Sequence, residues 1–515
     1  MRNKLFSSKR SMYDELVKNG KKYKDNIAIT CNQNKITYSS FINKVDEYAR
    51  SFYKMSINEL ETVTVILPNV IDTLVCIYAL NKLGAISNVV HYLSSLEEIK
   101  RSINDTHSHY IITDDNKLKY IKNICDEEYI YNVIYLSNNE VLSPIDKFKN
   151  LFKKRLNLST KYISFYRCRL LGHKLNKTIK STINSDNIAL IINNNFKKVY
   201  VTNDKVNYYA NNYLIDKEVF SNNLKILTDD TIINSIPIYH RSLTHGQNII
   251  LNSYDSTKLV MDNIIKYRPN ILEISGSTLE KICLNRSILS LSSVKLIICG
   301  KDKLDGNTYK KAKEMFYKSK IITTYGMIET TSNFTYNDSL DSKIDSVGIP
   351  IKDMCVKIVN VQDKSLCKAN EIGQICIKGP LICSNDEWLY SDDLGYLDKD
   401  NYLYIKSNLK RIIVSNGINI YPEEIENIIK KHDYVKDAYI VGVPHPYKKE
   451  VVKVYIVLKD KYILNSEIKK SIKEYCENNI AQYALPYAYA YRHELPKTNL
   501  GKIAYQKLIN ENEEE

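Results

Sequence analysis

Three segments, far apart in the chain, carry side chains that could act on a nucleotide. Residues 323–329 read Thr-Thr-Tyr-Gly-Met-Ile-Glu, and the carboxylate of Glu329 could hold a magnesium ion on nucleotide phosphates. Asp393 could accept hydrogen bonds from ribose hydroxyls. Lys502 follows a flexible glycine near the end of the chain, where a lysine that must reach a polyanion could be carried on a loop. Taken alone, each segment is explained better as a plain turn or, for Lys502, as a solvated lysine.

The elements that must position these residues form two segments in which predicted strands and helices alternate. From Ile27 to about Val133, β-rich runs (26–30, 62–67, 110–113, 133–136) alternate with helical segments (41–53, 73–83), which predicts βαβ units around a mostly parallel sheet. Gly84 stands where the second of these helices would stop. A second segment of alternating predicted strands and helices runs from Asp186 to about Tyr336.

The pattern changes twice in the remaining chain. Runs at 347–349, 356–361 and 373–378, punctuated by Gly and Pro, predict a β-rich subdomain. From Lys410 onward we expect a strand at 411–414, a turn, a helix that begins at Pro422, and strands at 438–443 and 451–458. The predicted fold class is α/β: a large N-terminal domain (1–409) of two α/β sheet subdomains plus the β-rich subdomain, and a small C-terminal α+β domain (410–515).

Composition bounds the class of protein. The 515 residues are 44% hydrophobic and 26% charged, which is typical of a globular protein and excludes disordered, collagenous and coiled-coil chains. The formal net charge of +14 favours anionic ligands. Eleven cysteines without a C-x-x-C pair predict reduced thiols and a cytoplasmic location. We expect neither a membrane span nor a secretory signal, because no apolar run is long enough.

One stretch, 147–180, holds eleven basic residues and no Asp or Glu, interleaved with Phe and Leu. It could lie on an anionic membrane surface as a peripheral contact. The simpler interpretation is a solvated surface insertion.

The order and spacing of the motifs resemble the AMP-forming adenylate-forming superfamily, which includes acyl-CoA synthetases, luciferases and peptide-synthetase adenylation domains. The resemblance runs from about Ile27 to Leu508. Its landmarks are residues 36–38 (Ile-Thr-Tyr), 67–69 (Leu-Pro-Asn), 83–85 (Leu-Gly-Ala), 236–240 (Ile-Pro-Ile-Tyr-His), 324–329 (Thr-Tyr-Gly-Met-Ile-Glu), 391–393 (Ser-Asp-Asp), Lys410, 416–426 and 496–502 (Pro-Lys-Thr-Asn-Leu-Gly-Lys).

The resemblance implies an ATP-dependent acid–thiol ligase that makes an acyl thioester through an acyl-adenylate, with ATP, Mg²⁺ and coenzyme A as cofactors. The substrate is a carboxylic acid, with fatty acids among the candidates, and the acceptor is CoA or a carrier-protein pantetheine; no nucleic acid is expected. The implied catalytic residues are Lys502 at the α-phosphate, Glu329 at the metal and His240 near the acid. The implied binding residues are Lys198, Gly300, Tyr325, Gly326, Asp393, Asn408 and Gly417, and Lys410 is the implied hinge of a mobile C-terminal domain.

Within this resemblance, the acid pocket is expected between the His240 region and residues 300–325, with Tyr239, His240, Ser242 and Leu243 as candidate walls. The alternative for His240 is a hydrogen-bonded core histidine.

The nucleotide side departs from the family pattern. The phosphate loop reads Asn-Asn-Asn-Phe-Lys-Lys at 193–198 and lacks glycine, Asn408 stands at an arginine position, and residues 301–303 (Lys-Asp-Lys) replace the adenine wall. Because backbone N–H groups cradle phosphates best in glycine-rich turns, these changes predict weaker ATP binding. They leave open a second class of function, a non-catalytic or weakly catalytic relative that binds an acyl group, a nucleotide or a partner protein.

Overall fold

The computed structural model describes residues 10–136, 161–173, 175, 179, 184–194, 197–212, 223–252, 257–284, 292–300, 304, 306–338, 340–360, 363–384, 386–408, 413–415, 418–420, 422–446, 448–496 and 508. The chain divides into two compact units. The larger unit comprises Met1–Tyr92 and Ser102–Lys406, and the smaller one comprises Leu93–Arg101 and Ser407–Glu515. The predicted boundary after residue 409 falls outside the described residues and stays a prediction.

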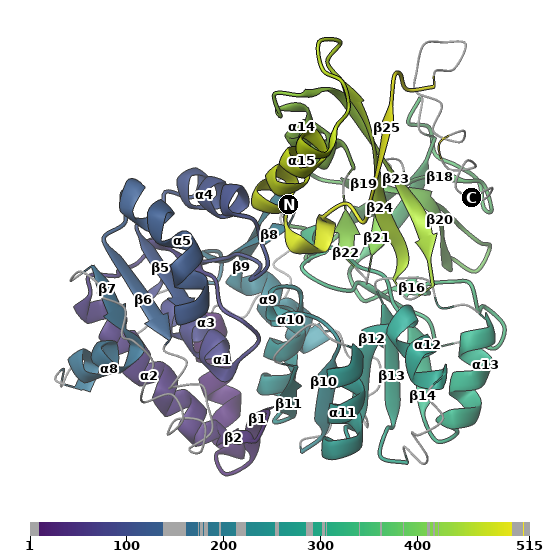
Figure 1. Ribbon diagram of the computed structural model, residues 1–515. Helices are drawn as coiled ribbons and strands as arrows, with labels where there is room; N and C mark the ends of the chain where they lie inside the picture. Colours follow the sequence, from purple (N-terminus) through teal and green to yellow (C-terminus); the bar gives the residue numbers. More distant parts are fainter. Residues whose placement is uncertain are drawn as a thin grey trace. The chain divides into compact units, whose positions relative to one another are not determined.

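The first sheet of the larger unit is parallel except at one edge (Figure 1). Its spatial order is β7 (Tyr162–Ser164), β6 (Asn132–Leu136), β5 (Tyr110–Asp114), β3 (Thr62–Val65), β4 (Ile86–Val89), β8 (Ile188–Asn194) and β9 (Lys197–Thr202). Strands β8 and β9 form an antiparallel hairpin in which Asn193 lies opposite Lys198.

The second sheet is also parallel except at its edge strand β2. Its spatial order is β14 (Lys320–Thr323), β13 (Leu296–Gly300), β12 (Ile271–Ser275), β10 (Lys225–Thr228), β11 (Asn248–Leu251), β1 (Ile27–Cys31) and β2 (Asn34–Thr37). Nearly every position of β10, β12 and β13 is buried, as expected for central parallel strands covered by helices on both faces.

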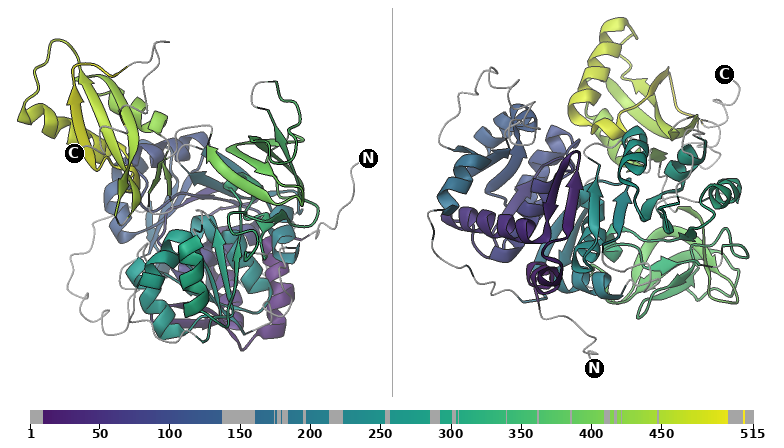
Figure 2. Two further views of the ribbon diagram at one scale, coloured as in Figure 1. Left: turned by 90° about the vertical axis from the view of Figure 1, so that its right-hand side faces the viewer. Right: turned by 90° about the horizontal axis from the view of Figure 1, so that it is seen from below.

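Helices α11 (Thr257–Tyr267), α12 (Gly276–Leu284) and α13 (Gly306–Met315) connect the strands on one side of β10. Helix α10 (Ile232–Thr244) connects β10 to β11 in the opposite direction, and right-handed crossovers therefore place it on the opposite face. Figure 2 shows the second sheet with helices on either side. The remaining helices of the larger unit's described part include α2 (Tyr38–Lys54), α3 (Ile71–Leu83), α5 (Asp115–Glu127), α8 (Phe165–His173) and α9 (Asn203–Asn212).

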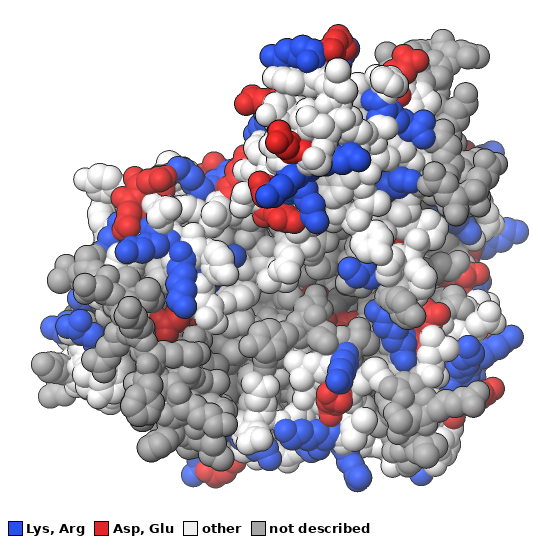
Figure 3. All heavy atoms as spheres, in the orientation of Figure 1, with Lys and Arg blue, Asp and Glu red and all other residues white. Residues whose placement is uncertain are grey.

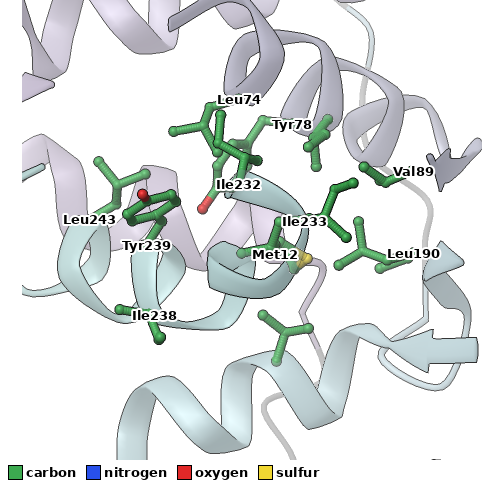
Figure 4. Packing of buried hydrophobic residues seen from close by; sticks show 14 of the residues in the cluster. Met12, Leu74, Tyr78, Val89, Leu190, Ile232, Ile233, Ile238, Tyr239 and Leu243 are labelled. Atoms are coloured by element: carbon green, nitrogen blue, oxygen red, sulfur yellow. The ribbon is translucent and has the colours of Figure 1, made fainter. Parts of the chain in front are cut away.

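Helix α3 joins the two sheets, because it contacts β1 of the second sheet and β4 of the first. Its residues from Thr73 to Leu83 are all buried, and Gly84, at φ +78°, ends the helix in the left-handed region that glycine tolerates. Figure 4 shows Leu74 and Tyr78 of α3 packed with Ile232, Tyr239 and Leu243 of α10. One continuous hydrophobic core therefore links both sheets.

The N-terminal helix α1 (Met12–Gly20) is fixed by two buried asparagines. The backbone N–H of Met12 donates to Oδ1 of Asn203 at 2.9 Å, and that of Tyr13 donates to Oδ1 of Asn81 at 3.0 Å. The first N–H groups of a helix have no partner within it, so these side chains satisfy them. Asn81 also donates to Asn203, which completes the network between α1, α3 and α9.

A β-rich part follows, with an antiparallel sheet of β17 (Cys355–Val359), β18 (Gly373–Lys378), β19 (Leu389–Leu397) and β20 (Leu403–Asn408), and a short pair, β15 (Thr335–Tyr336) and β16 (Ile349–Pro350). Gly348, at φ +92°, lies so close to Tyr336 that a side chain could not fit.

The smaller unit has its own sheet, in the order β22 (Ile418–Ile420), β21 (Ile413–Ser415), β24 (Lys449–Leu458) and β23 (Val435–His445), with β25 (Ala488–Arg492) parallel to β24. Helices α14 (Pro422–Lys430) and α15 (Ser466–Asn479) complete it, and α14 begins at the proline that the sequence indicated. Helix α4 (Leu96–Asp105) spans residues of both units.

Strand partners differ from the sequence-based expectation in two places. Strand β1 pairs with β11 in the second sheet, although its sequence position suggested the first, and β8 pairs with β4 in the first sheet, although its position suggested the second. A local pattern of β-forming residues predicts that a strand exists. Which strand it pairs with depends on contacts between residues that are distant in the sequence.

Charges of both signs are interspersed on the face in Figure 3. In the described part of the chain, no helix is long and apolar enough to cross a bilayer.

Candidate functional site

The second sheet changes its winding direction at β10. The chain passes from β10 through α10 to β11 on one side, and then crosses back to β12 on the other. In open parallel sheets, ligands bind beyond the carboxyl ends of the strands at such a switch point. There Asp229, directly after β10, accepts hydrogen bonds from the backbone N–H and the hydroxyl of Ser275 at the end of β12, at 2.9 and 2.7 Å. We therefore place the candidate site at the carboxyl ends of β10, β12, β13 and β14.

Two predicted site residues meet beside this edge. The hydroxyl of Tyr325, just past β14, donates to Oδ2 of Asp393 in β19 at 2.5 Å. Burial and the charge of Asp393 raise the pKa of Tyr325 well above its usual value, and Glu329 adds to the effect. The phenol is therefore neutral and donates its proton to the carboxylate of Asp393. The structure brings together Tyr325, Glu329 and Asp393.

Asp393 lies in the middle of β19 and not at its end. Register between β18 and β19 shifts, with Gln374 opposite Leu394 but Cys376 opposite Tyr390, so the intervening residues of β19 form a bulge. The hydroxyl of Ser391 accepts from the backbone N–H of Asp393 at 3.2 Å and holds this bulge. A bulge changes the direction in which the side chains of a strand point. The bulge in β19 therefore explains how Asp393, in the middle of the strand, reaches Tyr325.

Gly326 and Gly300 are required by the protein's own packing. A Cβ at Gly326 would lie 2.4 Å from Cα of Asn333, whose backbone pairs with Gly326. A Cβ at Gly300, the last residue of β13, would lie 2.8 Å from Oγ1 of Thr324 and 3.6 Å from Oδ1 of Asn333. Both glycines thus allow the segment after β14 to lie against β13. Their contact with a nucleotide stays a prediction.

His240 is buried in α10 with both ring nitrogens engaged. Nδ1 lies 2.7 Å from the hydroxyl of Tyr78, and Nε2 lies 2.8 Å from Oδ1 of Asn207. Because the amide nitrogen of Asn207 donates to the carbonyl of Arg10 at 2.9 Å, its oxygen accepts, and Nε2 carries the proton. Burial lowers the pKa of His240 to about 3, so the ring is neutral. These contacts favour the core-histidine interpretation, and a catalytic role stays a prediction.

Next to His240 is a buried network that sequence reasoning missed. Arg241 is 0% exposed, and its Nη2 donates to Oε2 of Glu273 at 2.8 Å. Nη1 donates to the hydroxyl of Tyr209 at 3.3 Å, and the amide of Asn333 donates to Oε1 of Glu273 at 3.3 Å. A glutamate in the middle of the apolar run 271–275 was the signal that could have found this network, because a charge in a central strand needs a partner.

Lys198 and the predicted phosphate loop lie at the β8–β9 hairpin of the first sheet. The ammonium of Lys198 is paired with the carboxylate of Asp105. The amide of Asn193 donates to Oδ1 of Asn88 and, at 3.3 Å, to the carbonyl of Val89. The side chain of Asn193 is therefore held against β4. Residues 195 and 196 lie outside the described residues.

Some of the predicted site residues fall outside the described part of the chain. Lys410, Gly417 and Lys502 lie outside the described residues, as does the side chain of Asn408, whose backbone ends β20. Most of the basic stretch 147–180 also lies outside them. In its described part, α8 exposes Tyr166, Leu170 and Leu171, and membrane contact stays a prediction.

Comparison with known proteins identifies the family. Residues 16–384 match the model of the AMP-binding enzyme family, and residues 424–502 match that of the AMP-binding enzyme C-terminal domain. The chain is 31% identical over 241 residues to a long-chain-fatty-acid–CoA ligase of Bacillus subtilis, a match that spans 44% of this chain and 42% of that one. It is 23% identical over 518 residues to the corresponding ligase of Salmonella typhimurium, across 91% of this chain and 89% of that one.

Solved structures share the fold. The amide bond synthetase McbA of Marinactinospora thermotolerans superposes with a TM-score of 0.80 at 15% identity, covering 97% of this chain and 99% of that one. The o-succinylbenzoate CoA synthetase MenE of Bacillus subtilis gives a TM-score of 0.78 at 18% identity, covering 97% and 98%. The predicted α/β class with a large N-terminal part and a small C-terminal part is confirmed, while the mobility of the latter stays a prediction. The resemblance first seen in the order and spacing of the motifs is confirmed as well, and the chain belongs to the AMP-binding enzyme family.

Proposed function

We propose that the chain is an ATP-dependent acid–thiol ligase that forms an acyl thioester, most simply an acyl-CoA, through an acyl-adenylate. The observation that carries the proposal is the hydrogen bond between Tyr325 and Asp393 just past the carboxyl end of β14, with Glu329 four residues after Tyr325. Matches to both domains of the family support it, as do relatives whose names are CoA ligases of different acids.

Asp393 accepts hydrogen bonds from the ribose hydroxyls, and Tyr325 holds its carboxylate in place. Glu329 suits Mg²⁺, because this ion is commonly held by one or two carboxylates together with substrate phosphates. Among the described residues no group of three His, Cys, Asp or Glu converges on one point, which fits such a one-carboxylate site better than an all-protein cage. When bound, Mg²⁺ neutralises phosphate charge. Gly300, Tyr325 and Gly326 lie against the adenine.

In the first half-reaction, an oxygen of the carboxylate bonds to the α-phosphorus of ATP and pyrophosphate leaves. Lys502 supplies a positive charge to the α-phosphate in this step. The acid lies between α10 and the ends of β13 and β14. In the second half-reaction, the chain turns at Lys410 and the loop at Gly417 covers the site. The thiol sulfur then bonds to the acyl carbon, AMP leaves, and the thiol proton passes to solvent.

The rival function is a non-catalytic relative that binds an acyl group, a nucleotide or a partner. Lys198 paired with Asp105, and Asn193 held against Asn88, favour this rival, because both side chains are engaged within the protein. Under the ligase proposal, Lys198 exchanges Asp105 for a phosphate oxygen.

Pyrophosphate release, measured across a panel of carboxylic acids with ATP and Mg²⁺, decides between the two functions. We expect release that depends on the acid, and AMP and acyl-CoA in equal amounts once CoA is added. The Lys502→Ala variant is the matched control, because it should bind nucleotide but release little pyrophosphate. Wild-type protein that gives no release above this control with any acid would favour the non-catalytic rival.

A further inference from the structure

A buried ion pair lies between the two walls of the proposed acid site. One wall is α10, where Arg241 directly follows His240, and Arg241 is among the largest fully buried side chains of the described chain. Its partner Glu273 stands in β12, only 5% exposed, with Thr228 of β10 and Ile298 of β13 on either side. The pair therefore lies at the centre of the second sheet, under the switch point.

The other wall is joined to the same pair. Asn333 donates to Glu273, pairs through its backbone with Gly326, and lies within 3.7 Å of the position that a Cβ on Gly300 would take. Tyr209 adds its hydroxyl to the guanidinium and its ring lies 5.8 Å from it. An unbroken set of polar contacts thus runs from α10 to the segment that follows β14.

This network limits which acids can enter. A long alkyl chain is stabilised by an apolar tunnel, because each methylene must leave water for apolar contact. Here such a chain would have to lie against a desolvated ion pair or push it apart, and separated charges in the interior are costly. An acid with a short body would instead end before it reaches the pair, and its own hydrogen-bonding groups are tolerated better beside polar side chains than a methylene chain is.

We propose that this chain takes a compact carboxylic acid that carries hydrogen-bonding groups, not a long-chain fatty acid, and that Arg241 and Glu273 set this specificity. The inference rests on the proposed function, which supplies the position of the acid. It differs from what the names of the long-chain relatives would suggest.

The first test compares kcat/KM for hexadecanoate, butanoate, 3-hydroxybutanoate and 4-hydroxybenzoate in the pyrophosphate assay. We expect the best of the two hydroxylated acids to exceed hexadecanoate at least tenfold. Equal or greater kcat/KM for hexadecanoate would overturn the inference while leaving the proposed function intact.

The second test replaces the pair. Because an ion pair exchanged as a whole for apolar residues is tolerated better than one broken singly, the Arg241→Met, Glu273→Leu double variant is the informative one. We expect the ratio of kcat/KM for hexadecanoate to kcat/KM for the better hydroxylated acid to rise at least tenfold in this variant. The matched control is the Lys82→Met, Asp46→Leu double variant, which removes a largely buried pair of 2.8 Å between α2 and α3 and should leave the preference unchanged. An unchanged preference in the Arg241 and Glu273 double variant contradicts the specificity role.

Thermal unfolding of each variant shows whether it folds. If the double variant does not fold, the Arg241→Gln, Glu273→Gln variant removes both charges and keeps hydrogen-bonding groups at both positions. We expect it to lower the ratio of kcat/KM for the better hydroxylated acid to kcat/KM for hexadecanoate at least threefold, and an unchanged ratio would refute the role of the pair.

A third test, which measures binding without turnover, separates this inference from the proposed function. The probes are the adenosine 5′-sulfamates of 4-hydroxybenzoate and hexadecanoate, which need no turnover. Tighter binding of the hydroxybenzoyl probe, even with no pyrophosphate from any acid, would support the inference and refute only the ligase activity. Binding of neither probe, or tighter binding of the hexadecanoyl probe, would overturn the inference.

Discussion

The hydroxyl of Tyr325 and the carboxylate of Asp393 are joined across 2.5 Å, although Tyr325 follows β14 of the second sheet and Asp393 lies in β19 of the antiparallel sheet. Hydrogen bonds to a charged group contribute about 1.5–3 kcal/mol. Tyr325→Phe should therefore weaken AMP binding about tenfold or more, because Asp393 loses the group that orients it toward ribose. Calorimetric titration with AMP measures this. Tyr396→Phe, in the same strand but stacked on Tyr404, is the control and should bind AMP normally. Unaltered AMP affinity in Tyr325→Phe would remove Asp393 from the ribose role.

Asp105 competes with phosphate for Lys198. The carboxylate of Asp105 is 40% exposed, and pairs of this kind contribute about 0–1 kcal/mol. Asp105→Asn should therefore improve ATP affinity by up to about fivefold and leave AMP affinity unchanged, since AMP lacks the outer phosphates. Lys198→Met should weaken ATP binding only. Asp262→Asn, an exposed acid on α11, serves as the control. If Lys198→Met binds ATP as tightly as wild type, Lys198 is not a phosphate ligand.

His240 makes stability depend on pH with a definite sign. Its pKa is about 3 in the folded protein, against about 6.5 for an unperturbed histidine. The unfolded state therefore binds the proton more readily, so the stabilisation is complete above pH 6.5 and is lost as pH falls toward 3. The free energy of unfolding should change by up to about 1.4 kcal/mol per pH unit in this window through His240 alone.

Urea unfolding at several pH values between 6.5 and 4 tests this. His240→Gln keeps a neutral polar group but cannot be protonated, so its stability should vary less with pH by about that slope. His91, whose pKa burial lowers to about 4, should leave some dependence in the variant. Identical slopes in wild type and variant would show that His240 does not titrate as its burial indicates.

Lys502→Ala tests the separation of the two half-reactions. Loss of one preorganised charge costs on the order of 3–4 kcal/mol, so adenylate formation should fall by a few orders of magnitude. Thioester formation from supplied acyl-adenylate should be nearly unaffected. The measurements are pyrophosphate release and acyl-CoA formation in parallel, with Lys473→Ala on the exposed face of α15 as the control. An equal loss in both half-reactions would exclude the assigned role.

The sequence predicted individual elements far better than their partners. The capped, periodic segments gave α3 and α14 almost to the residue, because Gly84 and Pro422 act locally. Strand β1 was assigned to the wrong sheet, because pairing with β11 depends on residues about 220 positions away, which local alternation does not encode.

The same distinction holds for the site. Tyr325, Glu329 and Asp393 could be chosen from motif spacing, yet their meeting depends on a bulge in β19 that no local pattern announced. Arg241 and Glu273 were missed because each looked like an isolated charge in an apolar segment. Only the fold shows that the two charges neutralise each other.

The anchoring of α1 by Asn81 and Asn203 has a consequence for the order of folding. The bond from Met12 to Asn203 joins residues 191 positions apart. At about 5–20 residues per second, a ribosome needs on the order of 10–40 s to supply that asparagine after it has made Met12. Until then, α1 can lie against α3, through Asn81, but not against α9 or α10, which have not yet been made. Helix α1 is thus among the elements that complete their native contacts late, and its side that faces α9 and α10 needs protection from aggregation until those helices have been made.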